Sequence, residues 1–227
     1  MLWQWMIGLS ILLALWYWIW FSMMPSEAHR WAGSLVKTGA SGVLALGFWA
    51  GDAPGWLVLG LTLGAAGDFA LSRPGQRWFL AGMASFAGGH LIYAGWLVGQ
   101  IGRLGGPELS VELLIGAAMI LALVASTEVW LAPHTGALKH PVRGYALVIG
   151  SMAGAAIFLP WNEGAALGIW IGAALFVASD LLLSLRLFRT SETCRSRILG
   201  GLVWPLYWTG QAMIVFGGTI YALLPKG

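Results

Sequence analysis

Charged residues are scarce in this chain. Asp, Glu, Lys and Arg make up only 9% of its 227 residues, whereas apolar residues make up 59%. A soluble domain normally carries about 25% charged residues, which water solvates at its surface. The scarcity excludes a water-soluble globular domain and predicts a protein whose surface faces lipid.

Cysteine is almost absent as well, which excludes an intramolecular disulfide. Cys194 is the only cysteine in the sequence. It stands near Arg189, Arg195 and Arg197, whose positive charges favour a thiolate. A nucleophilic cysteine also needs a paired base, and the sequence shows none beside it. We therefore assign Cys194 no catalytic role.

Long apolar runs occupy most of the sequence instead. A membrane span needs about 20 mainly apolar residues to cross roughly 30 Å of hydrocarbon. Breaks rich in Gly, Pro and charge separate the runs, as turns do. The first run lacks the basic start and small-residue cleavage site of a signal peptide, so we expect it to be retained. We predict eight spans in one transmembrane domain, at residues 2–24, 32–50, 55–71, 78–100, 110–131, 142–160, 164–186 and 199–224.

Basic residues alternate between the loops that join these spans. Lys and Arg collect on the cytoplasmic side of membrane proteins. The odd-numbered loops and the span ends beside them carry Arg30, Lys37, Arg73, Arg77, Lys139, Arg143, Arg186, Arg189, Arg195 and Arg197. The even-numbered loops contribute only Arg103, and the C-terminal tail only Lys226. This pattern predicts an all-α polytopic integral membrane bundle with both termini outside. It also accounts for the net charge of +3 without a nucleic-acid partner.

A short motif occurs twice, which indicates an internal repeat. Residues 66–72 and 178–184 both fit Ala-[Gly/Ser]-Asp-x-x-Leu-Ser, at the end of the third and the seventh predicted spans. Their offset is 112 residues (178 − 66), about half of the chain. Both spans run from outside to inside in the predicted topology. The sequence therefore predicts two four-span halves in parallel orientation.

Several polar side chains lie inside predicted spans, where an ionisable group costs about 2.5–3.5 kcal/mol on insertion scales. Each therefore needs a partner or a function. The residues are Lys37, Asp68, His90, Tyr93, Asp180, Tyr207 and Gln211. They come from different spans but share the inner half of the membrane, which predicts one polar cavity that opens toward the cytoplasm.

A structural role remains an alternative for each of these residues. Asp68 can pair with Arg73 or Lys37, and Asp180 with Arg186, as charges at the membrane boundary. His90 alone is equally typical of a hydrogen-bonded packing residue. The sequence does not decide between these interpretations.

The motifs around these residues resemble those of the YhhN-like lysoplasmalogenase family. The first signature is Gly67-Asp68-x-x-Leu71 followed by Phe86-x-x-Gly89-His90-Leu91-x-Tyr93, and the second is Ser179-Asp180-x-x-Leu183 followed by Tyr207-Trp208-Thr209-Gly210-Gln211. Pro141-Val142-Arg143-Gly144-Tyr145 followed by Met152 resembles the sixth span of the family. One departure is Lys37-Thr38, where the family usually has Lys-Pro.

The resemblance implies hydrolysis of the vinyl ether bond of lysoplasmalogens in a bacterial inner membrane, with a lysophospholipid substrate and membrane lipid as partners. The products are a fatty aldehyde and a glycerophospho-ethanolamine or -choline. Such hydrolysis needs an acid that protonates the β-carbon and a carboxylate that stabilises charge or activates water. Two aspartates in a low-dielectric cavity can take unlike protonation states, as glycosidase carboxylate pairs do.

We therefore predict Asp68 and Asp180 as the catalytic pair, without assigning which is the acid. His90, Tyr93, Tyr207 and Gln211 are predicted to orient the pair and the headgroup, and Lys37 to face the phosphate. We expect no cofactor and no metal, because one His with two Asp is a thin ligand set.

Three other functions stay open at this point. Parallel repeats and buried carboxylates also suit a proton-coupled transporter. A lysophospholipase would release fatty acid from related lipids instead of aldehyde. A non-catalytic membrane scaffold would tolerate the loss of both aspartates.

Overall fold

The computed structural model describes residues 1–22, 29–103, 110–159, 164–190 and 194–223. Their regular structure is helical throughout, which confirms the all-α class. The α-helices are α1 (Leu2–Trp16), α2 (Arg30–Ala50), α3 (Gly55–Leu71), α4 (Gln76–Arg103), α5 (Val111–Trp130), α6 (Lys139–Ile157), α7 (Gly164–Phe188) and α8 (Cys194–Leu223). A π-helical turn, η1 (Tyr17–Ser22), continues α1, and two 3₁₀ turns, η3 (Ala132–His134) and η4 (Gly136–Leu138), precede α6. The side chains of Cys194, Arg195 and Arg197 and the residue Lys226 lie outside the described part of the chain.

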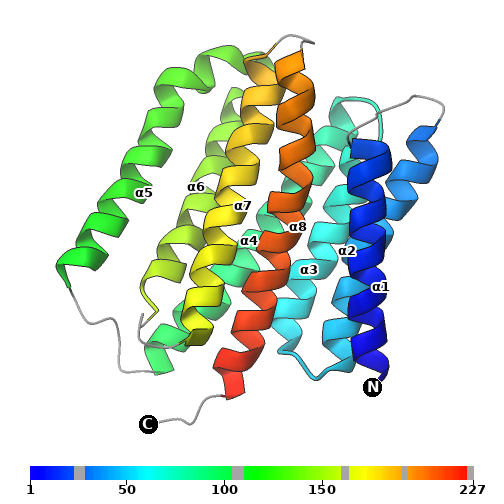
Figure 1. Cartoon of the computed structure of the whole chain (residues 1–227). Coiled ribbons are helices and arrows are strands. Elements are labelled where there is room, and N and C mark those ends of the chain that lie inside the picture. Colours follow the sequence, from blue (N-terminus) through cyan, green and yellow to red (C-terminus); the bar gives the residue numbers. More distant parts are fainter. Residues whose placement is uncertain (23–28, 104–109, 160–163, 191–193, 224–227) are drawn as a thin grey trace.

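The helices run up and down through one bundle (Figure 1). α1 begins and α8 ends at the same end of it. At the opposite end η1, α3, α5 and α7 end and α2, α4, α6 and α8 begin, and the described Lys and Arg residues other than Arg103 lie toward this end. We call it the basic end. That all eight helices cross a membrane remains a prediction.

Four helical segments within the described ranges are long and apolar enough to cross a membrane, namely Leu2–Ser22, Leu113–His134, Gly164–Phe188 and Ile198–Leu223. α3 is apolar but shorter. α2, α4 and α6 carry residues such as Lys37, His90 and Tyr145, which lower their hydropathy. Many large apolar side chains are exposed on the bundle, Leu121 at 70% and Val129 at 80% among them, as a lipid-facing surface requires.

Close helix crossings occur in both halves, between α3 and α4 and between α7 and α8. A Cβ on Gly89 of α4 would lie 3.1 Å from the carbonyl oxygen of Gly60 in α3. In the same way, a Cβ on Gly172 of α7 would lie 2.7 Å from the carbonyl oxygen of Gly210 in α8. Gly60 of α3 and Gly172 of α7 are 112 residues apart (172 − 60), the offset of the aspartate motifs, whereas Gly89 of α4 and Gly210 of α8 are 121 apart (210 − 89). Small residues let helix backbones meet this closely in lipid, and the matching crossings favour the predicted repeat.

The two halves meet along α4 and α6, while α8 approaches α2 and η1. Trp18 of η1 donates its indole N–H to the carbonyl oxygen of Gly201, at 2.7 Å, which ties the end of the first helix to α8. α5 stands at the edge of the bundle and packs mainly on α6 (Figure 1). The halves thereby enclose a space at the basic end, and α5 stays peripheral.

Candidate active site

A cavity of about 550 Å³ lies between the two halves at the basic end. Residues at the start of α2 and near the ends of α3 and α7 line it, together with η1 and α8. Both aspartates of the repeated motif, Asp68 and Asp180, are part of this lining. A cavity that contains the two aspartates is therefore present at the end that carries the basic residues. We call it the polar cavity, although apolar side chains such as Phe79 and Met83 also line it.

Asp68 is fully buried and surrounded by donors. Lys37 Nζ lies 3.0 Å from its Oδ1. Ser41 Oγ and Tyr207 OH both donate to its Oδ2, at 2.6 Å and 2.9 Å. These neighbours, one cation and two hydroxyl donors, suit Asp68 as a carboxylate, because each of them favours the ionised form. The Lys37 side chain is 17% exposed and lines the cavity, and its ammonium is paired with the buried Asp68.

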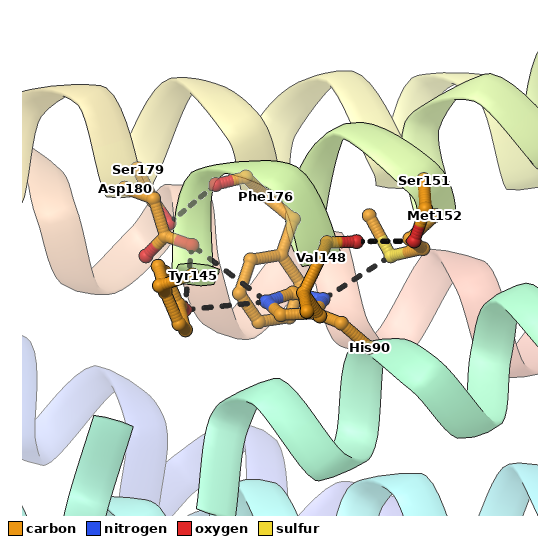
Figure 2. Close-up of polar contacts among 8 residues, drawn as sticks. All are labelled: His90, Tyr145, Val148, Ser151, Met152, Phe176, Ser179 and Asp180. Carbon is orange, nitrogen blue, oxygen red and sulfur yellow. Dashed lines mark hydrogen bonds and ion pairs between the residues drawn. The ribbon is translucent and has the colours of Figure 1, made fainter. Parts of the chain in front are cut away.

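Asp180 has different surroundings (Figure 2). Tyr145 OH donates to its Oδ2 at 2.9 Å, and His90 Nε2 lies 3.7 Å from the same oxygen. His90 Nε2 also lies 3.3 Å from Tyr145 OH. The Asp180 side chain is 17% exposed, whereas Asp68 has no exposed area. Of the two aspartates, Asp180 is the one that can touch a molecule in the cavity.

Met152 orients His90 from the far side. His90 Nδ1 lies 3.3 Å from Met152 Sδ. A thioether sulfur only accepts hydrogen bonds, so this contact is favourable when Nδ1 carries the proton. In neutral His90, Nε2 is then left as an acceptor that faces Tyr145 and Asp180. Phe176 also packs against His90, and their ring centroids lie 4.4 Å apart.

The contacts of the two aspartates follow one crosswise pattern. The first half is α1–α4 and the second is α5–α8. Asp68 is contacted from the second helix of its own half, by Lys37 and Ser41 of α2, and Asp180 from the second helix of its own half, by Tyr145 of α6. Each aspartate is also contacted from the fourth helix of the opposite half. Tyr207 of α8 contacts Asp68, and His90 of α4 contacts Asp180. Helices that correspond in the predicted repeat thus supply different chemistry to the two carboxylates.

The model of the YhhN family matches residues 3–218. The chain belongs to the YhhN family. Two similar proteins named lysoplasmalogenase, from Mycobacterium bovis and Mycobacterium tuberculosis, are each 32% identical over 166 residues. The matched segment covers 69% of this chain, and the chain spans about half of the relatives' length, at 56%. No solved structure matches.

Family membership and the apolar helices together identify this YhhN protein as an integral membrane protein. Among its predicted site residues, Lys37, Asp68, Asp180 and Tyr207 line the cavity. His90 contacts Asp180 from outside the lining, with 1% of its surface exposed. These five residues therefore form one contiguous group with the cavity.

Tyr93 and Gln211 lie elsewhere in the YhhN bundle. The Tyr93 ring packs on Gly60, and the Gln211 amide packs on Gly64, where a Cβ would collide with either side chain. Neither residue is part of the cavity lining. The Tyr93 hydroxyl and the Gln211 Nε2 are buried and have no hydrogen-bond partner in the described part of the protein. Both residues pack against α3 behind the site.

The alternative boundary pairings have mixed outcomes. Asp68 does pair with Lys37, as the structural interpretation allowed, and also borders the cavity. Arg73 instead donates to Ser34 Oγ at 2.8 Å, and its guanidinium stacks 3.5 Å above the Trp31 ring. Among the described side chains, Arg186 forms no ion pair with Asp180, and it lines the cavity.

Ser41 and Tyr145 are site residues that sequence reasoning missed. Ser41 is one of several small residues in α2, and its position one turn after Lys37 was the only available signal. Tyr145 belongs to the motif of residues 141–145, but nothing in the motif indicates that its hydroxyl reaches Asp180. The described residues hold no group of three or more His, Cys, Asp or Glu side chains that would suit a metal ion.

Proposed function

We propose that this YhhN protein hydrolyses the vinyl ether bond of lysoplasmalogens, giving a fatty aldehyde and a glycerophospho-ethanolamine or -choline. The observation that carries the proposal is the pair of repeat-related aspartates with unlike donor sets beside one cavity. The names of the two mycobacterial relatives support the same reaction class. Lipid substrate from the bilayer reaches such a cavity within the membrane.

Asp180 is the acid in this proposal. With Nδ1–H of His90 directed at Met152, Nε2 accepts a hydrogen bond from Tyr145 OH. The Tyr145 oxygen can then accept from a protonated Asp180 at 2.9 Å, which reverses the donor and acceptor of that contact. A neutral Asp180 carboxyl is thus satisfied by its neighbours, and its exposed edge delivers the proton into the cavity.

The reaction balances with one water molecule. Asp180 protonates the β-carbon, and the electron pair of the C=C bond forms the new C–H bond. The adjacent carbon becomes an oxocarbenium ion, which the Asp180 carboxylate now stabilises. Water adds to this carbon and its released proton returns to Asp180. The hemiacetal then breaks its C–O bond to glycerol, and the hydroxyl proton moves to the glycerol oxygen.

Asp68 holds the headgroup side of the cavity. Its carboxylate fixes Lys37 and Tyr207, and the partly exposed Lys37 side chain lines the space where a phosphate would lie. Arg186 lines the same cavity and adds a second cation. Cations arranged in this way position an anionic headgroup. Asp68 therefore acts through Lys37 and Tyr207, while Asp180 acts on the vinyl ether.

The proposal is tested with purified protein in lipid nanodiscs, given a lysoplasmalogen or the matching 1-acyl lysophospholipid. We expect aldehyde from the first and no fatty acid from the second. In D₂O, the aldehyde trapped at once by reduction carries one deuterium at carbon 2, because the β-carbon is protonated from solvent-exchanged Asp180. Fatty acid without aldehyde would establish a lysophospholipase instead. Proton-driven flux in proteoliposomes without any hydrolysis would establish a transporter.

A further inference from the structure

A second, apolar cavity adjoins the active site on the side of α5. It has a volume of about 420 Å³ and lies among α5, α6 and α7. Small residues of all three helices create the space, including Gly116, Ala146, Ala153 and Ala174. Few polar side chains border it, and these lie toward the basic end of the bundle. We call this space the chain groove.

The chain groove adjoins the polar cavity at Asp180. Val142, Tyr145, Asp180 and Ser184 line both spaces. The acid and the tyrosine that contacts it therefore stand at the junction of a polar and an apolar compartment. A molecule that is polar at one end and aliphatic at the other fits this division.

The other half of the repeat offers a useful contrast. An apolar hollow also lies between α2 and α3, with Gly42, Val43 and Thr62 in its lining. It shares no lining residue with the polar cavity and does not include Asp68. Of these two apolar spaces among the described residues, the groove of the second half is the one that borders a carboxylate.

We propose that the chain groove binds the single hydrocarbon chain of the lysolipid, with the vinyl ether at Asp180 and the headgroup in the polar cavity. The inference rests on the proposed function and adds a site for the chain. From Asp180 to Trp170, the far lining residue of α7, the helix rise gives a groove about 15 Å long. A chain of many methylenes extends along this length.

The peripheral position of α5 gives the chain a route from the bilayer. α5 packs mainly on α6 and stands at the edge of the bundle (Figure 1). Ala174 of α7, which lines the groove, is exposed. A chain in the bilayer is already out of water, so the groove selects by close packing rather than by the hydrophobic effect. Chain length and shape should consequently decide how well a substrate aligns with Asp180.

The first test uses Ala174→Phe and Ala153→Phe, which fill the groove from two different helices. The matched control is Val43→Phe, which adds bulk in the hollow between α2 and α3. We expect kcat/KM for a hexadecenyl substrate to fall at least about tenfold in both groove variants, a typical effect of pocket volume. An octenyl substrate should keep at least half of its turnover, and Val43→Phe should behave as wild type. An unchanged long-to-short ratio, or an equal loss for both lengths in both groove variants, would overturn the proposal.

The second test does not depend on hydrolysis, so it separates this inference from the proposed reaction. A non-hydrolysable 1-O-alkyl lysophospholipid with a diazirine at the chain end is photo-crosslinked to the protein in nanodiscs. Mass spectrometry should find the label on α5, α6 or α7 near Trp170, and Ala174→Phe should remove it. Labelling outside these helices, or labelling that Ala174→Phe leaves unchanged, would contradict the groove. Labelling in the groove without aldehyde release from lysoplasmalogen would retain the site and reject the reaction.

Discussion

At the residue scale, the Tyr145 hydroxyl joins Asp180 to His90. We expect Tyr145→Phe to lower kcat for aldehyde release about 10- to 100-fold with little change in KM, because it breaks the link but leaves the ring in place. His90→Gln should have a similar effect, and the double variant should be no worse than the stronger single one, because residues acting as a unit are not additive. Steady-state kinetics in nanodiscs measure all three.

Tyr93→Phe is the matched control for that experiment. The Tyr93 hydroxyl is also buried, but it has no hydrogen-bond partner among the described residues and does not line the cavity. Removing a buried hydroxyl without a partner costs no hydrogen bond. Tyr93→Phe should therefore keep wild-type kinetics. A loss as large as that of Tyr145→Phe would mean that the Asp180–Tyr145–His90 contacts have no special role.

Lys37 gives a second prediction at this scale. Lys37→Met leaves the buried Asp68 carboxylate without its cation. Breaking a buried ion pair by removing one partner costs about 3–5 kcal/mol, so the unfolding temperature should fall clearly in a thermal scan. Lys37→Met combined with Asp68→Asn should recover most of the stability but not the affinity for the phosphate-bearing substrate. If the double variant is no more stable than Lys37→Met, the pair does not hold α2 to α3.

The sequence predicts the residues of the site better than their contacts. Lys37, Asp68, His90 and Asp180 are recognisable because ionisable groups inside an apolar span need a partner or a function. Tyr93 is likewise a polar side chain inside an apolar span, but its ring packs on Gly60 behind the site. A tyrosine or amide in a span is ambiguous in this way, because its apolar part packs as well as any core side chain. Only the packing of α3 against α4 decides the case.

At the element scale, the crossing of α7 with α8 depends on glycine. A Cβ on Gly172 would lie 2.7 Å from the Gly210 carbonyl oxygen, and backbone cannot move away as a side-chain tip can. We expect Gly172→Ala to lower the free energy of unfolding by about 1–3 kcal/mol, as overpacking does. Gly95→Ala in α4 is the control, because its Cβ would meet nothing within 4 Å. Alanine is the better helix former, so Gly95→Ala should be neutral or stabilising in thermal unfolding. Equal destabilisation of both variants would contradict the crossing.

Helix positions follow closely from the apolar pattern, and helix ends less so. α3 has the bounds of its predicted span, 55–71. α8 instead begins at Cys194, five residues before the predicted 199, and α6 at Lys139 rather than 142. Hydropathy marks the part of a helix that suits lipid, whereas backbone hydrogen bonding continues into polar residues beyond it. The difference is therefore largest where polar residues flank the apolar run.

At the scale of the whole molecule, the basic end is predicted to face the cytoplasm. The test uses two single-cysteine variants, Gly55→Cys and Gln76→Cys, each made in a Cys194→Ser background. The two positions are exposed and lie at opposite ends of the bundle. A membrane-impermeant thiol reagent added to intact cells should label Gly55→Cys and spare Gln76→Cys. Labelling of Gln76→Cys alone would reverse the topology and place the active cavity outside.

The crosswise pairing of the halves is the part of the fold that the sequence did not predict. The repeated motif indicates two equivalent aspartates, but not that Tyr207 of α8 serves Asp68 while His90 of α4 serves Asp180. Those contacts arise from how one half packs on the other, which no local pattern encodes. The unlike roles of the two carboxylates follow from this packing.

The central claim is that these two aspartates perform different parts of one hydrolysis. Aldehyde release from lysoplasmalogen by Asp68→Asn, Asp180→Asn and Asp52→Asn in nanodiscs tests it most directly. Asp52 lies in the turn between α2 and α3, with a φ of 58° that asparagine tolerates, so Asp52→Asn is a matched control. We predict that Asp180→Asn loses at least about 100-fold in kcat, that Asp68→Asn mainly raises KM, and that Asp52→Asn retains full activity. Wild-type kcat in Asp180→Asn, or wild-type KM in Asp68→Asn, would contradict the account.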